Sequence, residues 1–116
     1  MTRSGEHYLS SLRDGRSVFI DGEKVNDVTT HPAFAQAAKS IAKLYDYQSA
    51  PENIERMTFA SPTSGERVSR SWELPKSYEQ LVTRRLALTS WAELTCGMMG
   101  RSPDHVASTM AGFSMG

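Results

Sequence analysis

The sequence has only one cysteine, Cys96, so no internal disulfide can form. No apolar leader precedes the first charged residues, and we therefore expect no secretory signal and a reduced, cytoplasmic protein. Arg, Glu, Ser or Gly interrupts every apolar stretch before it reaches the roughly 20 residues that span a bilayer. These absences argue against a disulfide-stabilised secreted domain and against a membrane protein.

An excess of charge of one sign is also missing, because 13 Lys and Arg balance 13 Asp and Glu. The global charge therefore favours neither nucleic acid nor an anionic membrane surface as a partner. The three histidines, His7, His31 and His105, lack metal-ligand spacing, and we predict no metal site. Neither G-x-G-x-x-G nor G-x-x-x-x-G-K-[ST] occurs, so we expect no local phosphate-binding loop.

The 116 residues fit one compact domain with a modest core. Residues 97–116 hold four of the six methionines, and flexible apolar residues of this kind usually fill gaps against other elements. We therefore expect a single domain over residues 1–116 that is a fragment of a longer protein.

Turn residues predict two small β-hairpins. Asp21-Gly22 supplies the positive φ angles of a tight turn between strands at 17–20 and 23–28. The second hairpin pairs 56–60 with 66–74 across a loop that contains proline and glycine.

Capping residues and helical spacing predict three helices before residue 97. Ser4 caps the first, which Gly15 ends; a second covers 32–46; and the longest follows the Ser77–Gln80 capping box. The predicted fold class is mainly α with two small β-hairpins, an α+β domain.

The long helix carries Tyr78, Trp91 and several leucines at core spacing, and we expect them to pack inside the protein. Cys96 is expected to be a buried, inert thiol, since no partner stands at a catalytic spacing. The adjacent pair Arg84 and Arg85 is expected to lie on solvated helix surface, because neighbours on a helix do not share a face.

The segment Gly100–His105 is the candidate site. A glycine turn is followed by Ser102 as a helix cap and Pro103 at the first helical position. Such a start directs backbone N–H groups and the Arg101 guanidinium toward one spot, which suits an oxygen anion. His105 lies one turn further on and can bond a hydroxyl near neutral pH. Structural or surface roles for Arg101 and His105 remain open alternatives from the residues alone.

Five short segments, taken in order, resemble the amino-terminal region of the 4-hydroxyphenylacetate 3-monooxygenase family. They are Ser4–Leu9, Leu12–Arg16, Thr30–Pro32, Met57–Phe59 and Gly100–Asp104. The family includes oxygenases of phenols and chlorophenols, a pyoverdine-pathway enzyme and the related 4-hydroxybutyryl-CoA dehydratase.

The resemblance implies the amino-terminal helical domain of an acyl-CoA-dehydrogenase-like fold, with the β-barrel and the carboxy-terminal helical bundle absent. It implies that an NAD(P)H-dependent flavin reductase supplies reduced FAD, which reacts with O2 to a flavin hydroperoxide. Oxygen is then transferred ortho to the hydroxyl of a phenol of the 4-hydroxyphenylacetate, phenol or chlorophenol type. The full-length oxygenase would be a homotetramer, and this segment alone would be inactive.

The resemblance assigns Arg101 to the flavin edge and the phenol, as a catalytic donor to phenolate or peroxide oxygen. His105 stands where a family hydroxylase has a tyrosine that holds the phenol hydroxyl. The substrate-binding role therefore carries over to His105 with a different side chain, which puts 4-hydroxyphenylacetate itself in doubt as the substrate.

Two alternatives stay open. A relative of the dehydratase would be a lyase with an iron–sulfur cluster held by several cysteines, of which only Cys96 is present. A small α+β binding module without chemistry would instead pack its methionine-rich tail internally.

Overall fold

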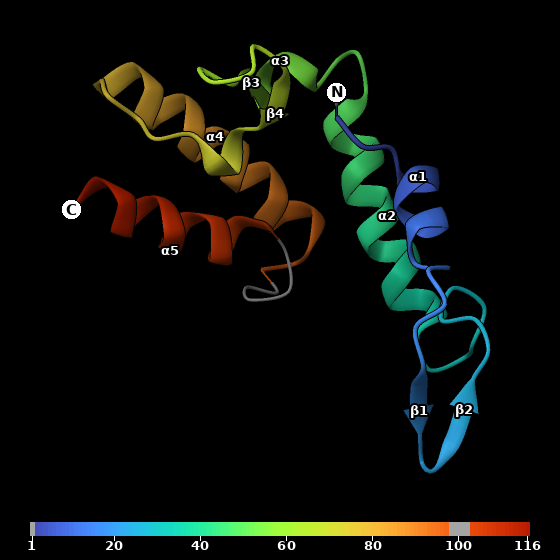
Figure 1. The fold of residues 1–116 in the computed structure, drawn as a ribbon. Helices are drawn as coiled ribbons and strands as arrows, with labels where there is room; N and C mark the ends of the chain where they lie inside the picture. The colour runs from blue at the N-terminus through green and yellow to red at the C-terminus, as the bar shows by residue number, and fades with distance from the viewer. Residues whose placement is uncertain (1, 98–102) are drawn as a thin grey trace. The chain divides into compact units, whose positions relative to one another are not determined.

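The computed structural model of the protein describes residues 2–97 and 103–116, and residues 98–102, which include Arg101, lie outside this description. The elements in chain order are α1 Gly5–Ser11, β1 Val18–Ile20, β2 Glu23–Val25, α2 Ala35–Ser49, α3 Ile54–Met57, β3 Thr58–Ala60, β4 Arg67–Ser69, the 3-10 helix η1 Arg70–Trp72, α4 Tyr78–Leu94 and α5 Pro103–Met115 (Figure 1). The predicted class, mainly α with two small β-hairpins, is confirmed. No helix in the described ranges is long and apolar enough to cross a membrane.

The chain divides into two compact units, one over Arg3–Tyr47 and one built chiefly from Gln48–Gly116. In the first unit α1 lies against α2, and the backbone N–H of Gly5 donates to Asp46 Oδ1 across 2.8 Å. A Cβ at Gly5 would lie only 2.5 Å from the carbonyl oxygen of Ala42, so the close approach of the two helices requires glycine. Tyr8 and Tyr45 stack with ring centroids 5.1 Å apart.

The first hairpin forms at the predicted turn, but its strands, β1 Val18–Ile20 and β2 Glu23–Val25, are shorter than the predicted 17–20 and 23–28. β1 and β2 pair antiparallel with Val18 opposite Val25. Asp21 and Gly22 both have positive φ, 51° and 81°, which is the conformation that the Asp-Gly pair supplies in a tight turn.

The second unit holds the candidate site. β3 and β4 pair antiparallel with Thr58 opposite Ser69, and η1 leads from β4 toward α4. Both α4 and α5 contact η1 and each other, and Figure 1 shows the two helices side by side. Trp91 and Ala107 are almost completely buried there. The core of this unit is therefore centred on η1.

Several predicted boundaries were wrong by a few residues. α1 ends at Ser11, before Gly15, and α2 covers Ala35–Ser49 instead of 32–46 because His31–Phe34 forms a turn in which the carbonyl of His31 accepts from Phe34. The strand predicted over 56–60 is only Thr58–Ala60, since Met57 closes a helical turn onto Asn53. The strand predicted over 66–74 gives way to η1 after Ser69.

The predicted core of α4 was partly wrong. Trp91 is buried as expected, but Tyr78, Leu81 and Leu94 are exposed, with 80% of Tyr78 accessible. The buried face of α4 runs through Arg84, Ala87 and Trp91, at steps of three and four residues. The inward face therefore contains a charged residue, which apolar periodicity does not find.

Two further expectations were corrected. Cys96 is exposed, because the chain turns out of α4 at this residue with a positive φ of 53°. Arg84 is buried while Arg85 is exposed, so only Arg85 confirms the predicted solvated surface.

Candidate functional site

A groove of about 340 Å³ lies between α4 and α5 in the second unit. It is lined by Arg85, Leu88, Thr89, Ala92, Gly97, His105, Ser108 and Thr109. The volume is at the small end of the range for small-molecule sites, about 300–1,000 Å³, and suits one ring system. A whole dinucleotide would extend beyond it.

The two predicted site residues differ in what the structure says of them. Gly100, Arg101 and Ser102 lie outside the described residues. Pro103 is the first residue of α5, as predicted. His105 is exposed on the first turns of α5 and lines the groove. The carbonyl oxygen of His105 accepts from Thr109 Oγ1 at 3.0 Å, so this turn of α5 has a side-chain hydrogen bond in addition to its backbone bonds.

Arg85 is the groove residue that the sequence argument missed. It comes from α4 and is the permanently charged side chain among the lining residues. The signal was present, because Arg85, Leu88 and Ala92 follow helical spacing and so share a face of α4. The expectation of a merely solvated surface took no account of the helix that packs beside this face.

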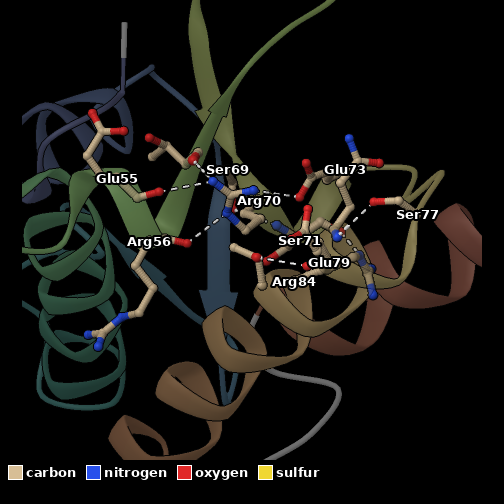
Figure 2. Close-up of polar contacts among 12 residues, drawn as sticks. Glu55, Arg56, Ser69, Arg70, Ser71, Glu73, Ser77, Glu79 and Arg84 are labelled. Carbon is tan, nitrogen blue, oxygen red and sulfur yellow. Dashed lines mark hydrogen bonds and ion pairs between the residues drawn. The ribbon is translucent and has the colours of Figure 1, made fainter.

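Arg70 on η1 connects this short helix to its neighbours in the second unit. Its guanidinium makes four hydrogen bonds (Figure 2). Three go to the backbone carbonyls of Glu55, Arg56 and Thr58, at 3.0, 2.8 and 2.6 Å. The fourth is an ion pair with Glu73 Oε2 at 2.7 Å, in which both side chains are nearly buried. Arg70 therefore joins η1 to α3 and β3.

Polar contacts also connect η1 to the two helices of the groove. Trp91 Nε1 on α4 donates to Ser71 Oγ at 3.0 Å. Arg84 Nη2 donates to the carbonyl of Ser71 at 2.8 Å and to Ser108 Oγ on α5 at 3.3 Å. Burial lowers the pKa of the Arg84 guanidinium, and the nearby Glu73 carboxylate partly offsets this effect.

The groove combines apolar walls with a guanidinium and an imidazole. The walls can bury a flat ring, Arg85 can attract a negative charge, and His105 can donate to or accept from a hydroxyl. This set fits an aromatic compound with a polar substituent, or one edge of a flavin ring. Within the described ranges, no group of three or more His, Cys, Asp or Glu residues is placed to hold a metal ion.

Comparison with known proteins identifies the family. Residues 4–116 match the family described as 4-hydroxyphenylacetate 3-hydroxylase N terminal. The chain belongs to this family. It is 44% identical over 111 residues to the 4-hydroxyphenylacetate 3-monooxygenase oxygenase component of Geobacillus sp. (strain PA-9), which covers 94% of this chain and 22% of the relative. The chain thus spans about a fifth of the length of the curated relatives it matches.

Solved structures agree with the predicted fold. The oxygenase component (HpaB) of 4-hydroxyphenylacetate 3-monooxygenase, complexed with FAD and 4-hydroxyphenylacetate, superposes with a TM-score of 0.79 at 39% identity, over 90% of this chain and 22% of that one. An archaeal 4-hydroxybutyryl-CoA dehydratase from N. maritimus gives a TM-score of 0.65 at 26% identity, over 80% of this chain and 18% of that one. The predicted family and the predicted fold class are confirmed.

Proposed function

We propose that this chain is the amino-terminal domain of the oxygenase component of a two-component monooxygenase. The complete protein would use reduced FAD and O2 to hydroxylate a phenol ortho to its hydroxyl group. The observation that carries the proposal is the family match over residues 4–116, together with 44% identity to a named oxygenase component. The complex of a relative with FAD and 4-hydroxyphenylacetate supports the cofactor and the substrate class.

In this proposal the α4–α5 groove forms one wall of the site. Arg101 would donate to the phenolate or to the oxygen being transferred, since an arginine is charged at every physiological pH. His105 would bond the phenol hydroxyl from its exposed place on α5. Reduced FAD would supply the activation of O2, while the apolar groove walls exclude water from the ring.

The proposal also includes partners and further domains. An NAD(P)H-dependent reductase would deliver the reduced FAD, and a β-barrel and a helical bundle would complete a homotetramer. The fraction of the relatives that this chain spans, about a fifth, supports the existence of further domains. A cytoplasmic location is also part of the proposal.

The likeness to the dehydratase supports a second candidate, a lyase with an iron–sulfur cluster. The lower identity to the dehydratase structure, 26% against 39% for the oxygenase structure, favours the oxygenase. Iron analysis of the protein from the complete reading frame separates the two, because the oxygenase would be iron-free.

The experiment that tests the proposal mixes the protein from the complete reading frame with chemically reduced FAD, O2 and a panel of phenols. We expect ortho-hydroxylated product, and a loss of about 100-fold in kcat for Arg101→Gln, as for removal of one donor to a developing oxyanion. The 116-residue chain alone serves as the control and is expected to form no product. Hydroxylation by that chain alone, or none by the complete protein, would contradict the proposal.

A further inference from the structure

Arg84 is a buried cation with an incomplete set of partners. The residue is only 9% exposed, and its Nε is buried without a hydrogen-bond partner. In the described part of the chain it forms no ion pair, and the nearby carboxylate of Glu73 is paired with Arg70. Its Nη2 donates to two neutral acceptors, the carbonyl of Ser71 and the hydroxyl of Ser108.

Burying Arg84 in this way costs more free energy than packing alone would justify. A buried charge that meets only neutral acceptors loses more hydration than an apolar side chain of similar volume would. Unlike an apolar side chain, Arg84 makes directional hydrogen bonds, and its planar guanidinium fixes the relative position of the groups that it bonds. Those groups belong to η1 and α5, two elements separated by the whole of α4 in the chain.

One end of this connection is rigid. Ser71 is fully buried, and its hydroxyl accepts from Trp91 Nε1. Figure 2 shows Ser71 and Arg84 close to Arg70, which anchors the same 3-10 helix to the backbone of α3 and β3. Arg84 therefore holds Ser108 against a fixed point.

The other end lies in the candidate site. Ser108 follows His105 by three residues, which places both side chains on one face of α5. Both line the groove between α4 and α5. If α5 slid along its axis or rotated about it, Ser108 and His105 would move together, since they are three residues apart in the same helix.

We propose that Arg84 is a positioning residue that holds α5 through Ser108 and so sets the place of His105 in the groove. This inference rests on the proposed function, in which His105 binds the phenol. Arg84 itself does not touch the substrate. Its effect is on how well the phenol is oriented, which governs both its binding and the fraction of O2 that ends in product.

The test uses the protein from the complete reading frame in a double-mutant cycle of Ser108→Ala and Arg84→Met. Each single variant is expected to raise the KM for the phenol about tenfold, as for loss of a hydrogen bond to a charged group, with a smaller change in kcat. More H2O2 should be released per reduced FAD oxidised. The KM of the double variant should be no higher than that of the more impaired single variant, because both changes remove the same hydrogen bond. Arg84→Lys, which keeps a donor, should recover part of the loss.

Ser114→Ala is the matched control, since Ser114 lies on the same helix and, among the residues that the structure describes, its hydroxyl bonds only to the local carbonyl of Met110. It is expected to leave KM and H2O2 release unchanged. Equal effects of Ser108→Ala and Ser114→Ala, or single effects that multiply in the double variant, would overturn the inference. If Arg84→Met does not fold, the comparison of the two serine variants decides alone.

The failure of the proposed function would be visible separately, as an unsubstituted protein that hydroxylates no phenol. In that case the imidazole proton signals of His105 provide the readout in the same variants. Ser108→Ala is expected to shift them and Ser114→Ala to leave them in place, and unmoved signals in both would overturn the inference.

Discussion

The indole N–H of Trp91 on α4 donates to the hydroxyl of Ser71 on η1 across 3.0 Å, and both side chains are buried. This bond joins η1 to α4, one of the two helices that line the groove with His105. It joins the only buried tryptophan among the described residues to the short helix around which the second unit packs. The stability of the site therefore depends on a polar contact inside an otherwise small core.

Removing this acceptor should destabilise the second unit. Ser71→Ala is expected to lower the free energy of unfolding by about 1–3 kcal/mol, because the buried indole N–H loses its bond to the hydroxyl. Urea unfolding followed by tryptophan fluorescence measures the change. Trp72, which is 51% exposed, gives the control: Trp72→Phe should change the signal but leave the unfolding midpoint close to that of the unsubstituted chain.

Loss of the Arg70 side chain should be more damaging. Arg70→Ala is expected to cost about 3–5 kcal/mol, since it leaves the nearly buried Glu73 carboxylate without its ionic partner. Circular dichroism during urea unfolding reports the midpoint. Arg16→Ala serves as the control, because the Arg16–Asp14 pair is about half exposed and local in sequence. A similar loss in both variants would contradict the assigned role of Arg70.

Two glycines in helices should respond to alanine in opposite directions. Gly5→Ala is expected to destabilise the first unit by about 1–3 kcal/mol, since its Cβ would overlap the backbone of α2. Gly112→Ala on α5 meets no atom within 4 Å and should stabilise that helix by up to about 1 kcal/mol. Thermal unfolding of the two variants distinguishes them. Equal shifts would show that α1 and α2 do not approach as described.

Asp27 should make the first unit sensitive to acid. Hydrogen bonds from Thr29, together with one from Arg13, lower the pKa of Asp27 from 3.8 to about 2. Because the folded carboxyl has the lower pKa, its contribution to stability is present above pH 4 and is lost as the pH falls toward 2. Titration of the carboxyl carbon by NMR gives the pKa directly. A midpoint near 3.8 would contradict this prediction, and Asp27→Asn should weaken the loss of stability in the same range.

Local chemistry explains which features of the fold could be predicted. Ser77 accepts from the N–H of Gln80, and Asp21-Gly22 makes the β1–β2 turn, because caps and turns depend on residues a few positions apart. The burial of Arg84 could not be predicted in this way. Its partners, Ser71 and Ser108, lie 13 and 24 residues away, so the interaction exists only once the helices have packed.

The candidate site shows the same division. His105 was found from a short motif and from a family resemblance, and it lies in the groove. Arg85 was missed because its significance comes from α5 packing beside α4, which no local pattern of charges indicates. The role of Arg101 stays a prediction, since this residue lies outside the described part of the chain.

The most direct test of the proposed oxygenase is isotope labelling. The protein from the complete reading frame, supplied with reduced FAD and a phenol under ¹⁸O2, should form a catechol that carries one atom of ¹⁸O at the position ortho to the original hydroxyl, as seen by mass spectrometry. A catechol oxygen derived from water, or reduced FAD consumed with no labelled product from any phenol, would contradict the proposal.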